Sequence, residues 1–359
     1  MRKLIITAAC IATALISIGC AKQQKIGAND ADKRYFEAWL KVNNINVEPS
    51  GRGIYVLEDT PGKGREVIAN GFAFLEFVTT DLNGNVTSYT NADMAKKLGE
   101  FSPSTYYGPE FISTYDGNIY AGVFDMLKDM KVGGTRKAIV PSWLISYKNY
   151  DSESQYLETA TNQNSAIYEV KVKDFTTDIN RWERDTVCRF FANKNVMVAG
   201  KPANEVFTND KGWTMSEEDT LKTGFWYKQL KAPVDTTSFP SDTTLYINYT
   251  GMTLDGRVFD TTIEDIAKDH NIYVAGKTYE PVSINWPSEG EEFTSVTMGT
   301  SESTLINGFS YTIWQMRAME EGVGIFTSSH GYGNTGSGES IPGYAPLIFH
   351  IQIVEQPKE

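Results

Sequence analysis

The stretch Tyr249-Thr-Gly-Met-Thr-Leu-Asp-Gly-Arg-Val-Phe-Asp260 decides the fold of the second half of this 359-residue chain. Asp255-Gly256 is a dipeptide typical of tight hairpin turns, because glycine tolerates a positive φ. The stretch therefore predicts a strand, a turn and a return strand that ends in Phe259 and Asp260.

Two later segments predict a helix and a strand. Gly308, within Leu305-Ile-Asn-Gly-Phe309, marks the opening of a helix. Leu347-Ile-Phe-His-Ile-Gln-Ile353 alternates with the period of two that is typical of a strand. Tyr332-Gly333 and Ile341-Pro342 lie between these two segments and predict a loop.

In this order, the segments of the second half resemble the FKBP-type peptidyl-prolyl cis-trans isomerase family. The resemblance implies an antiparallel twisted β-sheet wrapped on one short helix, with an aromatic pocket between them and no cofactor. Carried over position by position, it implies three catalytic residues, namely Asp260, Tyr332 and Phe349. It also implies substrate-binding residues, which are Tyr249, Phe259, Leu305, Ile306, Phe309 and Ile341. Phe309 stands where the family usually has Trp.

The implied chemistry needs no acid, base or nucleophile. A prolyl isomerase has to favour the twisted amide over either planar form, and an apolar pocket does so by accepting the proline ring and removing water from the amide. The hydroxyl of Tyr332 would then hydrogen-bond a substrate carbonyl, and Asp260 would form a polar wall. The alternatives are that the aromatic residues are simply core, or that the pocket is vestigial in a non-catalytic binding protein.

The first half of the chain is predicted to be a diverged repeat of the second. Each half has an N-terminal helix, an Asn-Gly or Asp-Gly turn, a glycine that opens a second helix and a closing alternating strand. This pattern predicts an α+β fold, and the resemblance implies that it consists of two FKBP-like domains, each preceded by an extra N-terminal helix. In the first half, Thr87 and Ser88 replace the Phe-Asp pair, Val123 replaces the pocket floor and Tyr168 replaces the last-strand Phe.

The first half is therefore predicted to be a degenerate domain that does not catalyse and instead docks, spaces or binds partners. The alternative is a different groove built from Tyr106, Tyr107, Tyr115 and Tyr120.

The predicted boundaries divide the chain into five parts. They are a signal peptide (1–19), a lipidated tether (20–31), the degenerate domain with its N-terminal helix (32–176), a linker helix region (177–219) and the isomerase domain (220–359). An insertion at 261–298 goes beyond the minimal family, and it forms either a wall over the groove or a surface elaboration.

The N-terminal residues predict export. Arg2 and Lys3 precede an apolar run over 4–18, the arrangement of a secretory signal peptide. Ser17-Ile18-Gly19-Cys20 resembles the lipobox of bacterial lipoproteins, which implies lipidation of Cys20. The alternative is a plain signal peptide. We therefore expect a protein of the bacterial cell envelope, anchored to a membrane and facing the periplasm or the cell surface. Its partners would be proline-containing segments of unfolded envelope proteins.

Composition excludes two classes of function. The chain has 33 Lys and Arg against 45 Asp and Glu, and its net charge of -12 argues against nucleic-acid binding. Three His and three Cys leave little material for a metal site, so none is expected. Cys188 is predicted to be a small buried residue of a helix.

Overall fold

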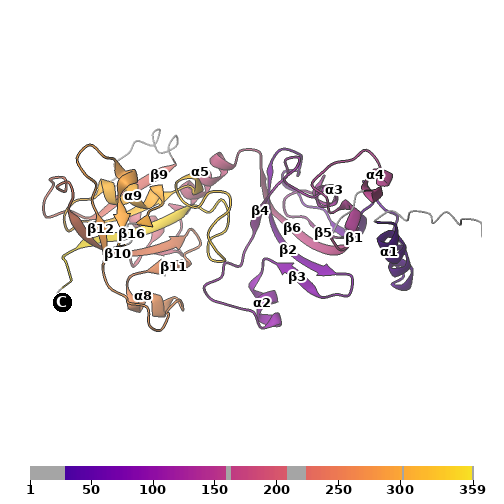
Figure 1. Ribbon diagram of the computed structural model, residues 1–359, viewed down its shortest axis with the longest axis horizontal. Helices are drawn as coiled ribbons and strands as arrows, with labels where there is room; N and C mark the ends of the chain where they lie inside the picture. The colour runs from indigo at the N-terminus through magenta and orange to yellow at the C-terminus, as the bar shows by residue number, and fades with distance from the viewer. Residues whose placement is uncertain (1–28, 159–162, 208–223, 301–302, 358–359) are drawn as a thin grey trace, which may run out of the picture.

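The structure, a computed structural model, describes residues 29–158, 163–207, 224–300 and 303–357, and it shows two α+β halves that each contain one main antiparallel sheet (Figure 1). The predicted fold class is confirmed. None of the helices in these ranges is long and apolar enough to cross a membrane.

The first half contains four α-helices, one 3-10 helix and six strands among the described residues. The helices are α1 (Asp30–Val42), α2 (Ala92–Leu98), α3 (Ala121–Leu127), η1 (Ser142–Leu144) and α4 (Glu153–Glu158). The strands are β1 (Tyr55–Thr60), β2 (Phe72–Asp81), β3 (Val86–Tyr89), β4 (Glu110–Ser113), β5 (Thr135–Val140) and β6 (Ala166–Thr176).

The second half begins with a helical region that packs on its sheet. The helices are α5 (Ile179–Phe190), α6 (Ala203–Val206), α8 (Glu264–Asp269), η2 (Phe293–Ser295), α9 (Asn307–Gln315) and η3 (Ser328–His330). The strands are β7 (Met197–Val198), β8 (Lys201–Pro202), β9 (Phe225–Lys231), β10 (Thr244–Thr253), β11 (Val258–Thr261), β12 (Val282–Asn285), β13 (Thr297–Met298), β14 (Ser303–Thr304), β15 (Glu321–Phe326) and β16 (Leu347–Val354).

The two main sheets share one strand order. The first runs β1-β5-β6-β2-β3, and the second has the matching path β9-β15-β16-β10 with β11 on β10. In each half the long strand of the hairpin also pairs with a later strand, β4 on β2 and β12 on β10. The connections that lead to these two strands correspond as well, over 90–109 and 262–281, and each carries one short helix, α2 or α8. Part of the segment predicted as an insertion therefore has a counterpart in the first half.

Strand register extends the correspondence to single residues. Thr79 pairs with Tyr168 across β2 and β6, and Gly251 pairs with Phe349 across β10 and β16. Tyr168 and Phe349 therefore occupy the same place in the two sheets.

The neighbouring hairpin strand gives a second matched pair. Ser88 on β3 pairs with Thr79, and Asp260 on β11 pairs with Gly251. Ser88 is thus the first-half counterpart of Asp260, as the sequence comparison predicts.

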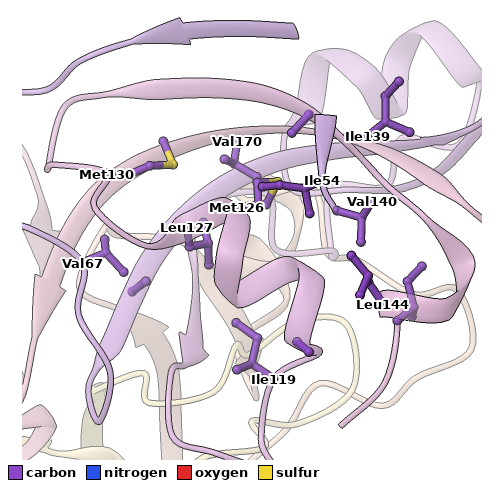
Figure 2. Packing of buried hydrophobic residues seen from close by; sticks show 14 of the residues in the cluster. Ile54, Val67, Ile119, Met126, Leu127, Met130, Ile139, Val140, Leu144 and Val170 are labelled. Carbon is purple, nitrogen blue, oxygen red and sulfur yellow. The ribbon is translucent and has the colours of Figure 1, made fainter. Parts of the chain in front are cut away.

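In each half a glycine allows the helix over the sheet to pack closely against it. A Cβ on Gly122 of α3 would lie 2.6 Å from a methyl group of Val140, and a Cβ on Gly308 of α9 would lie 2.3 Å from the ring of Phe326. Contacts this close require glycine, so each helix packs directly on its sheet. Figure 2 shows the core beneath α3, where Met126 is fully buried.

The helix that precedes each half packs on it through an apolar face. In α1, Phe36 and Leu40 are buried, and the Phe36 ring lies 5.4 Å from that of Tyr55. Tyr35 of the same helix is 59% exposed, because the turn of the helix directs it to solvent.

Helix α5 has an N-cap at Asp178, whose side chain accepts a hydrogen bond from the backbone nitrogen of Arg181 at 3.0 Å. Val187 and Phe190 of this helix are buried. Cys188 is exposed, which corrects the prediction that it is buried, because it lies on the opposite face of α5 from Phe190 and Val187.

Candidate functional site

The floor of the candidate site consists of buried aromatic and aliphatic side chains of the second half. Phe309 of α9, Phe349 of β16 and Ile341 of the loop between β15 and β16 are 3%, 4% and 4% exposed. The rings of Phe309 and Phe349 meet edge to face, with centroids 4.8 Å apart. Phe349 is also stacked against Phe326, at 5.8 Å. The floor is therefore a fixed apolar surface.

Two partly exposed rings stand above this floor. Tyr249 of β10 meets Phe309 edge to face at 5.4 Å, and Phe259 of β11 meets Phe349 in the same way at 5.6 Å. Gly251 makes this possible, because a Cβ there would lie 2.7 Å from the Phe259 ring and 2.8 Å from the Phe349 ring. The sequence Tyr-Thr-Gly thus places one aromatic ring and leaves space for two others.

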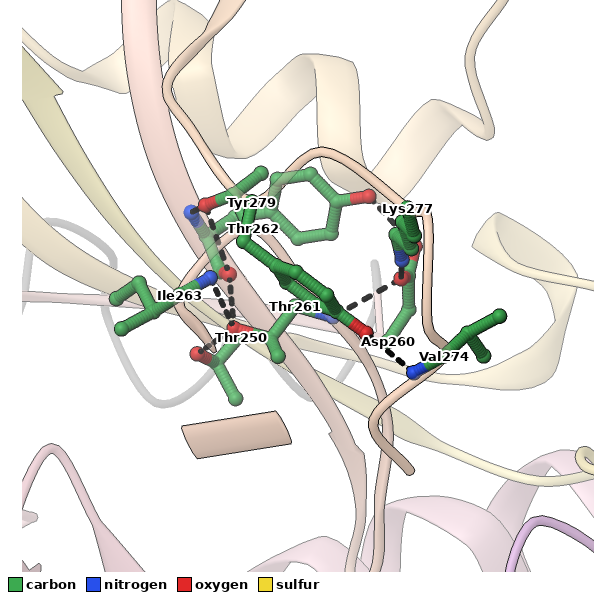
Figure 3. A network of polar contacts seen from close by, with 9 residues as sticks. Thr250, Asp260, Thr261, Thr262, Ile263, Val274, Lys277 and Tyr279 are labelled. Atoms are coloured by element: carbon green, nitrogen blue, oxygen red, sulfur yellow. Dashed lines mark hydrogen bonds and ion pairs between the residues drawn. The ribbon is translucent and has the colours of Figure 1, made fainter. Parts of the chain in front are cut away.

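Asp260 provides the charged group of the site. Its Oδ2 accepts a hydrogen bond from the Tyr249 hydroxyl at 2.5 Å, and its Oδ1 accepts one from the backbone nitrogen of Thr261 at 2.9 Å. Lys277 donates to the same Oδ1 at 2.8 Å, as Figure 3 shows. Lys277 was not predicted as a site residue, because it lies on the 262–281 connection and carries no local motif.

Burial and the Asp260 carboxylate raise the pKa of both tyrosine hydroxyls of the site. Burial, the charge of Asp260 and the hydrogen bond to it raise the pKa of Tyr249 far above its usual range. Burial, followed by the charge of Asp260, also raises the pKa of Tyr332. At neutral pH both phenols are protonated, so each can donate a hydrogen bond.

The remaining predicted residues pack against the same core. Leu305, Ile306 and Tyr332 are partly buried members of the cluster that contains the floor. Ile306 occupies the N-cap position of α9, and Leu305 also lines a hollow of about 760 Å³ beside β12 and β13. Eight of the nine predicted residues therefore belong to one core cluster, namely Tyr249, Phe259, Leu305, Ile306, Phe309, Tyr332, Ile341 and Phe349, and Asp260 joins it through its hydrogen bond to Tyr249.

The loop that carries Tyr332 and Ile341 is held from the other half of the molecule. The backbone nitrogen of Tyr106 donates to the carbonyl of Glu339 at 2.7 Å. The guanidinium of Arg257 lies 5.4 Å from the centre of the Tyr106 ring and donates to the carbonyl of Ser340. This contact between the halves was not predicted, because the sequence does not show which surfaces face each other.

The same loop makes a ring contact with the first half further along. Tyr344 lies edge to face with Phe72 at 5.4 Å and with Phe111 at 5.7 Å. The first half thus contacts the closing loop of the site on both sides of Pro342.

The predicted signal peptide (1–19), most of the tether (20–31) and the lipidation residue Cys20 lie outside the described residues. The linker helix region (177–219) is described up to residue 207.

Comparison with known proteins supports the resemblance predicted for the second half. Residues 236–354 match the family model of the FKBP-type peptidyl-prolyl cis-trans isomerases. The match spans all nine predicted site residues, and the predicted resemblance is confirmed for this part of the chain. A search of curated proteins finds no match.

Several solved structures are similar at low identity. One holds the three FKBP domains of wheat FKBP73, with 14% identity, a TM-score of 0.27 and coverage of 84% of this chain and 92% of that one. A peptidyl-prolyl cis-trans isomerase of Pseudomonas syringae pv. tomato has 16% identity, a TM-score of 0.30 and coverage of 49% and 92%. FkpA of Escherichia coli has 17% identity, a TM-score of 0.29 and coverage of 49% and 62%.

Proposed function

We propose that the second half is a peptidyl-prolyl cis-trans isomerase that acts on X-Pro bonds. The observation that carries this proposal is the Tyr249–Asp260 hydrogen bond above the floor of Phe309 and Phe349, within a segment that matches the family model. X-Pro is the common peptide bond with a populated cis form, and its rotation barrier is about 18–20 kcal/mol. A catalyst needs only to bind the twisted amide more tightly than the planar ones.

The geometry favours the twisted amide in two ways. The apolar floor receives the proline ring and removes water from the amide, which loses resonance and charge separation as it twists. The Tyr332 hydroxyl, which is protonated at neutral pH, donates a hydrogen bond to a substrate carbonyl and fixes the peptide's turn. Asp260 orients Tyr249 through their hydrogen bond and transfers no proton.

The cellular setting that we propose is the bacterial envelope. The apolar run over 4–18 and the segment that ends in Cys20 support export and a lipid anchor, and unfolded exported proteins would then be the clients. Replacement of Cys20 by Ala should move the protein from the membrane fraction to the soluble fraction. Retention of Cys20→Ala in the membrane fraction would contradict the anchor.

The isomerase is tested by cis/trans exchange of a short Ala-Leu-Pro-Phe-type peptide, measured by NMR exchange spectroscopy with the full chain. Tyr332→Phe removes only the hydroxyl, and we expect kcat/KM to fall severalfold, because a hydrogen bond contributes about 1 kcal/mol. Tyr273→Phe is the matched control on an exposed ring and should retain full activity. Equal rates in Tyr332→Phe and wild type would contradict the role of Tyr332.

One observation favours a second function, the binding of peptides without catalysis. Asp260 is already engaged by Tyr249, Thr261 and Lys277, and Phe309 replaces the family's usual Trp. The two functions are distinguished by the same peptide titrated into the wild-type chain. A binding protein would show saturable chemical-shift changes without faster exchange, whereas the isomerase shows both.

A further inference from the structure

The first half has a cavity at the place where the second half has its aromatic floor. The cavity measures about 210 Å³ and lies between β2, β6 and α3. Phe77, Val123 and Tyr168 contribute to its lining. Tyr168 has the register position of Phe349. The strand pairing therefore shows that the cavity and the aromatic floor occupy corresponding places in the two halves.

The cavity exists because the first half lacks one ring of the floor. Val123 is the third residue after the N-cap Tyr120 in α3, just as Phe309 is the third residue after the N-cap Ile306 in α9. The glycine that follows the first residue of each helix keeps both helices in contact with their sheets. Since α3 is already held close to its sheet, the space left by the smaller valine stays open.

The lining is apolar, with polar groups confined to tyrosines and one amide. Leu75 and Met126 form a buried part of the wall. Tyr120 and Tyr147, whose ring centroids are 4.3 Å apart, also line the cavity, and Tyr147 is 52% exposed at its mouth. The side chain of Asn118 is the amide.

This lining selects the class of ligand. Among the described residues that line the cavity, none is charged, so a charged group would lose its hydration without compensation. A volume of about 210 Å³ is below the roughly 300–1,000 Å³ of sites for cofactors and drug-sized molecules. It suits a single apolar side chain. The Asn118 amide donates to Ser113 Oγ at 3.3 Å, and its oxygen can accept a hydrogen bond from the backbone beside that side chain.

We propose that the first half binds one uncharged apolar side chain of an extended polypeptide segment in this cavity. In this half Ser88 stands at the register position of Asp260, and the cavity holds the segment without isomerising it. The proposal goes beyond the isomerase and does not depend on it, because the two sites lie in different halves and are observed separately.

The test uses the full chain with ¹³C-labelled methionine methyl groups. Met126 lines the cavity, whereas Met316 is buried in the core of the second half. The probe is the acetylated and amidated tripeptide Gly-Leu-Gly, with Gly-Lys-Gly as its charged control. We expect Gly-Leu-Gly to shift the Met126 signal saturably, with at least tenfold weaker binding of Gly-Lys-Gly and no shift at Met316.

Val123→Phe supplies the missing ring and should abolish the Met126 shift, while the Met316 signal and the second half's prolyl exchange remain as in wild type. Val123→Leu fills the cavity partly and should weaken binding by an intermediate factor, which keeps the test informative where Val123→Phe does not fold. The proposal would be overturned if no Met126 shift appeared at a peptide concentration 20-fold above ~1 mM, the Kd of a weak complex. A shift that survives a folded Val123 variant unchanged would also overturn it.

Discussion

In each half a glycine of the central helix packs against the corresponding strand of the sheet. The two halves nevertheless fill the space beside that helix differently. In the second half Phe309, Phe349 and Phe259 meet in one cluster with Asp260 at its edge. In the first half Val123 leaves a cavity at the corresponding place. The arrangement of the strands and the central helix depends on backbone pairing and on glycine, whereas the site depends on a few side chains. The same strand pairing can therefore carry a filled aromatic cluster in one half and a cavity in the other.

The connection between the hairpin and the next strand shows the same divergence. In the second half it carries Lys277 to Asp260 of the same half. In the first half the corresponding connection carries Tyr106 to the loop at Glu339 of the other half. A segment repeated in the fold has thus become part of the site in one half and a contact between the halves in the other.

Substitution of the two glycines at the helix–sheet contacts, Gly122 and Gly308, should have the largest effects on stability. Gly308→Ala should lower the free energy of unfolding by about 3 kcal/mol and Gly122→Ala by about 2 kcal/mol, because overpacking costs about 1–3 kcal/mol or more and alanine regains up to ~1 kcal/mol of helix propensity. The Phe326 ring yields less easily than the Val140 methyl group. Urea unfolding measures both changes. Two variants as stable as wild type would show that the helices do not need this close approach.

The helices that precede the two halves differ in their buried groups. Helix α1 buries Phe36 and Leu40, whereas α5 buries Glu183, whose carboxylate accepts hydrogen bonds from the nitrogen and hydroxyl of Ser328 at 2.6 and 2.7 Å. Burial outweighs these bonds and raises the pKa of Glu183 to about 7.

A raised pKa means that the folded state binds this proton more tightly than the unfolded state. The stabilising contribution is therefore complete below about pH 4.5, the ordinary pKa of Glu, and is lost as the pH rises to about 7. Between pH 5 and pH 8, wild type should lose about 2 kcal/mol more stability than Glu183→Gln. Urea unfolding at the two pH values measures this difference. Equal losses in the two proteins would contradict the burial argument.

Contact between the halves should have a smaller effect on the isomerase. Arg257→Ala removes the hydrogen bond to Ser340 and the contact with Tyr106, so the loop with Tyr332 should be held less firmly. We expect a rise in KM of about threefold with kcat nearly unchanged, and partial rescue in Arg257→Lys, since ~0.6 kcal/mol is within the range for such a contact. A fall in kcat alone would contradict a positioning role.

The ion pair of the site should contribute least. Lys277 and Asp260 have side chains that are 43% and 39% exposed, and such pairs contribute about 0–1 kcal/mol. Lys277→Ala should therefore change the free energy of unfolding by less than about 1 kcal/mol, while Lys277→Arg should behave as wild type. Thermal unfolding at low and high salt measures this, and a loss of several kcal/mol would show that the connection depends on this pair.

Local sequence patterns were sufficient for most of the strands, turns and helices. The Asp255-Gly256 turn, the helix at Gly308 and the strand over 347–353 are all present, because each depends on neighbouring residues. Patterns failed where a side chain's environment depends on distant parts of the chain. The exposure of Cys188 and the ion pair of Lys277 are two such cases.

The correspondence of the two connections was also missed. Residues 90–109 and 262–281 take the same route in the two halves, yet only their strand pairing reveals it. Their side chains contact different parts of the molecule and have no common motif. The cavity of the first half likewise depends on how close α3 approaches its sheet, which the substitution of Val123 alone does not show.

The central claim is that the second half isomerises prolyl bonds and that the first half does not. It is tested most directly by exchange on the Ala-Leu-Pro-Phe-type peptide with Asp260→Ala and Ser88→Ala, two changes at the same register position. We predict acceleration by the wild-type chain, a loss of at least tenfold in Asp260→Ala, equivalent to about 1.4 kcal/mol, and full activity in Ser88→Ala. No acceleration by the folded wild-type chain, or equal losses in the two variants, would contradict the account.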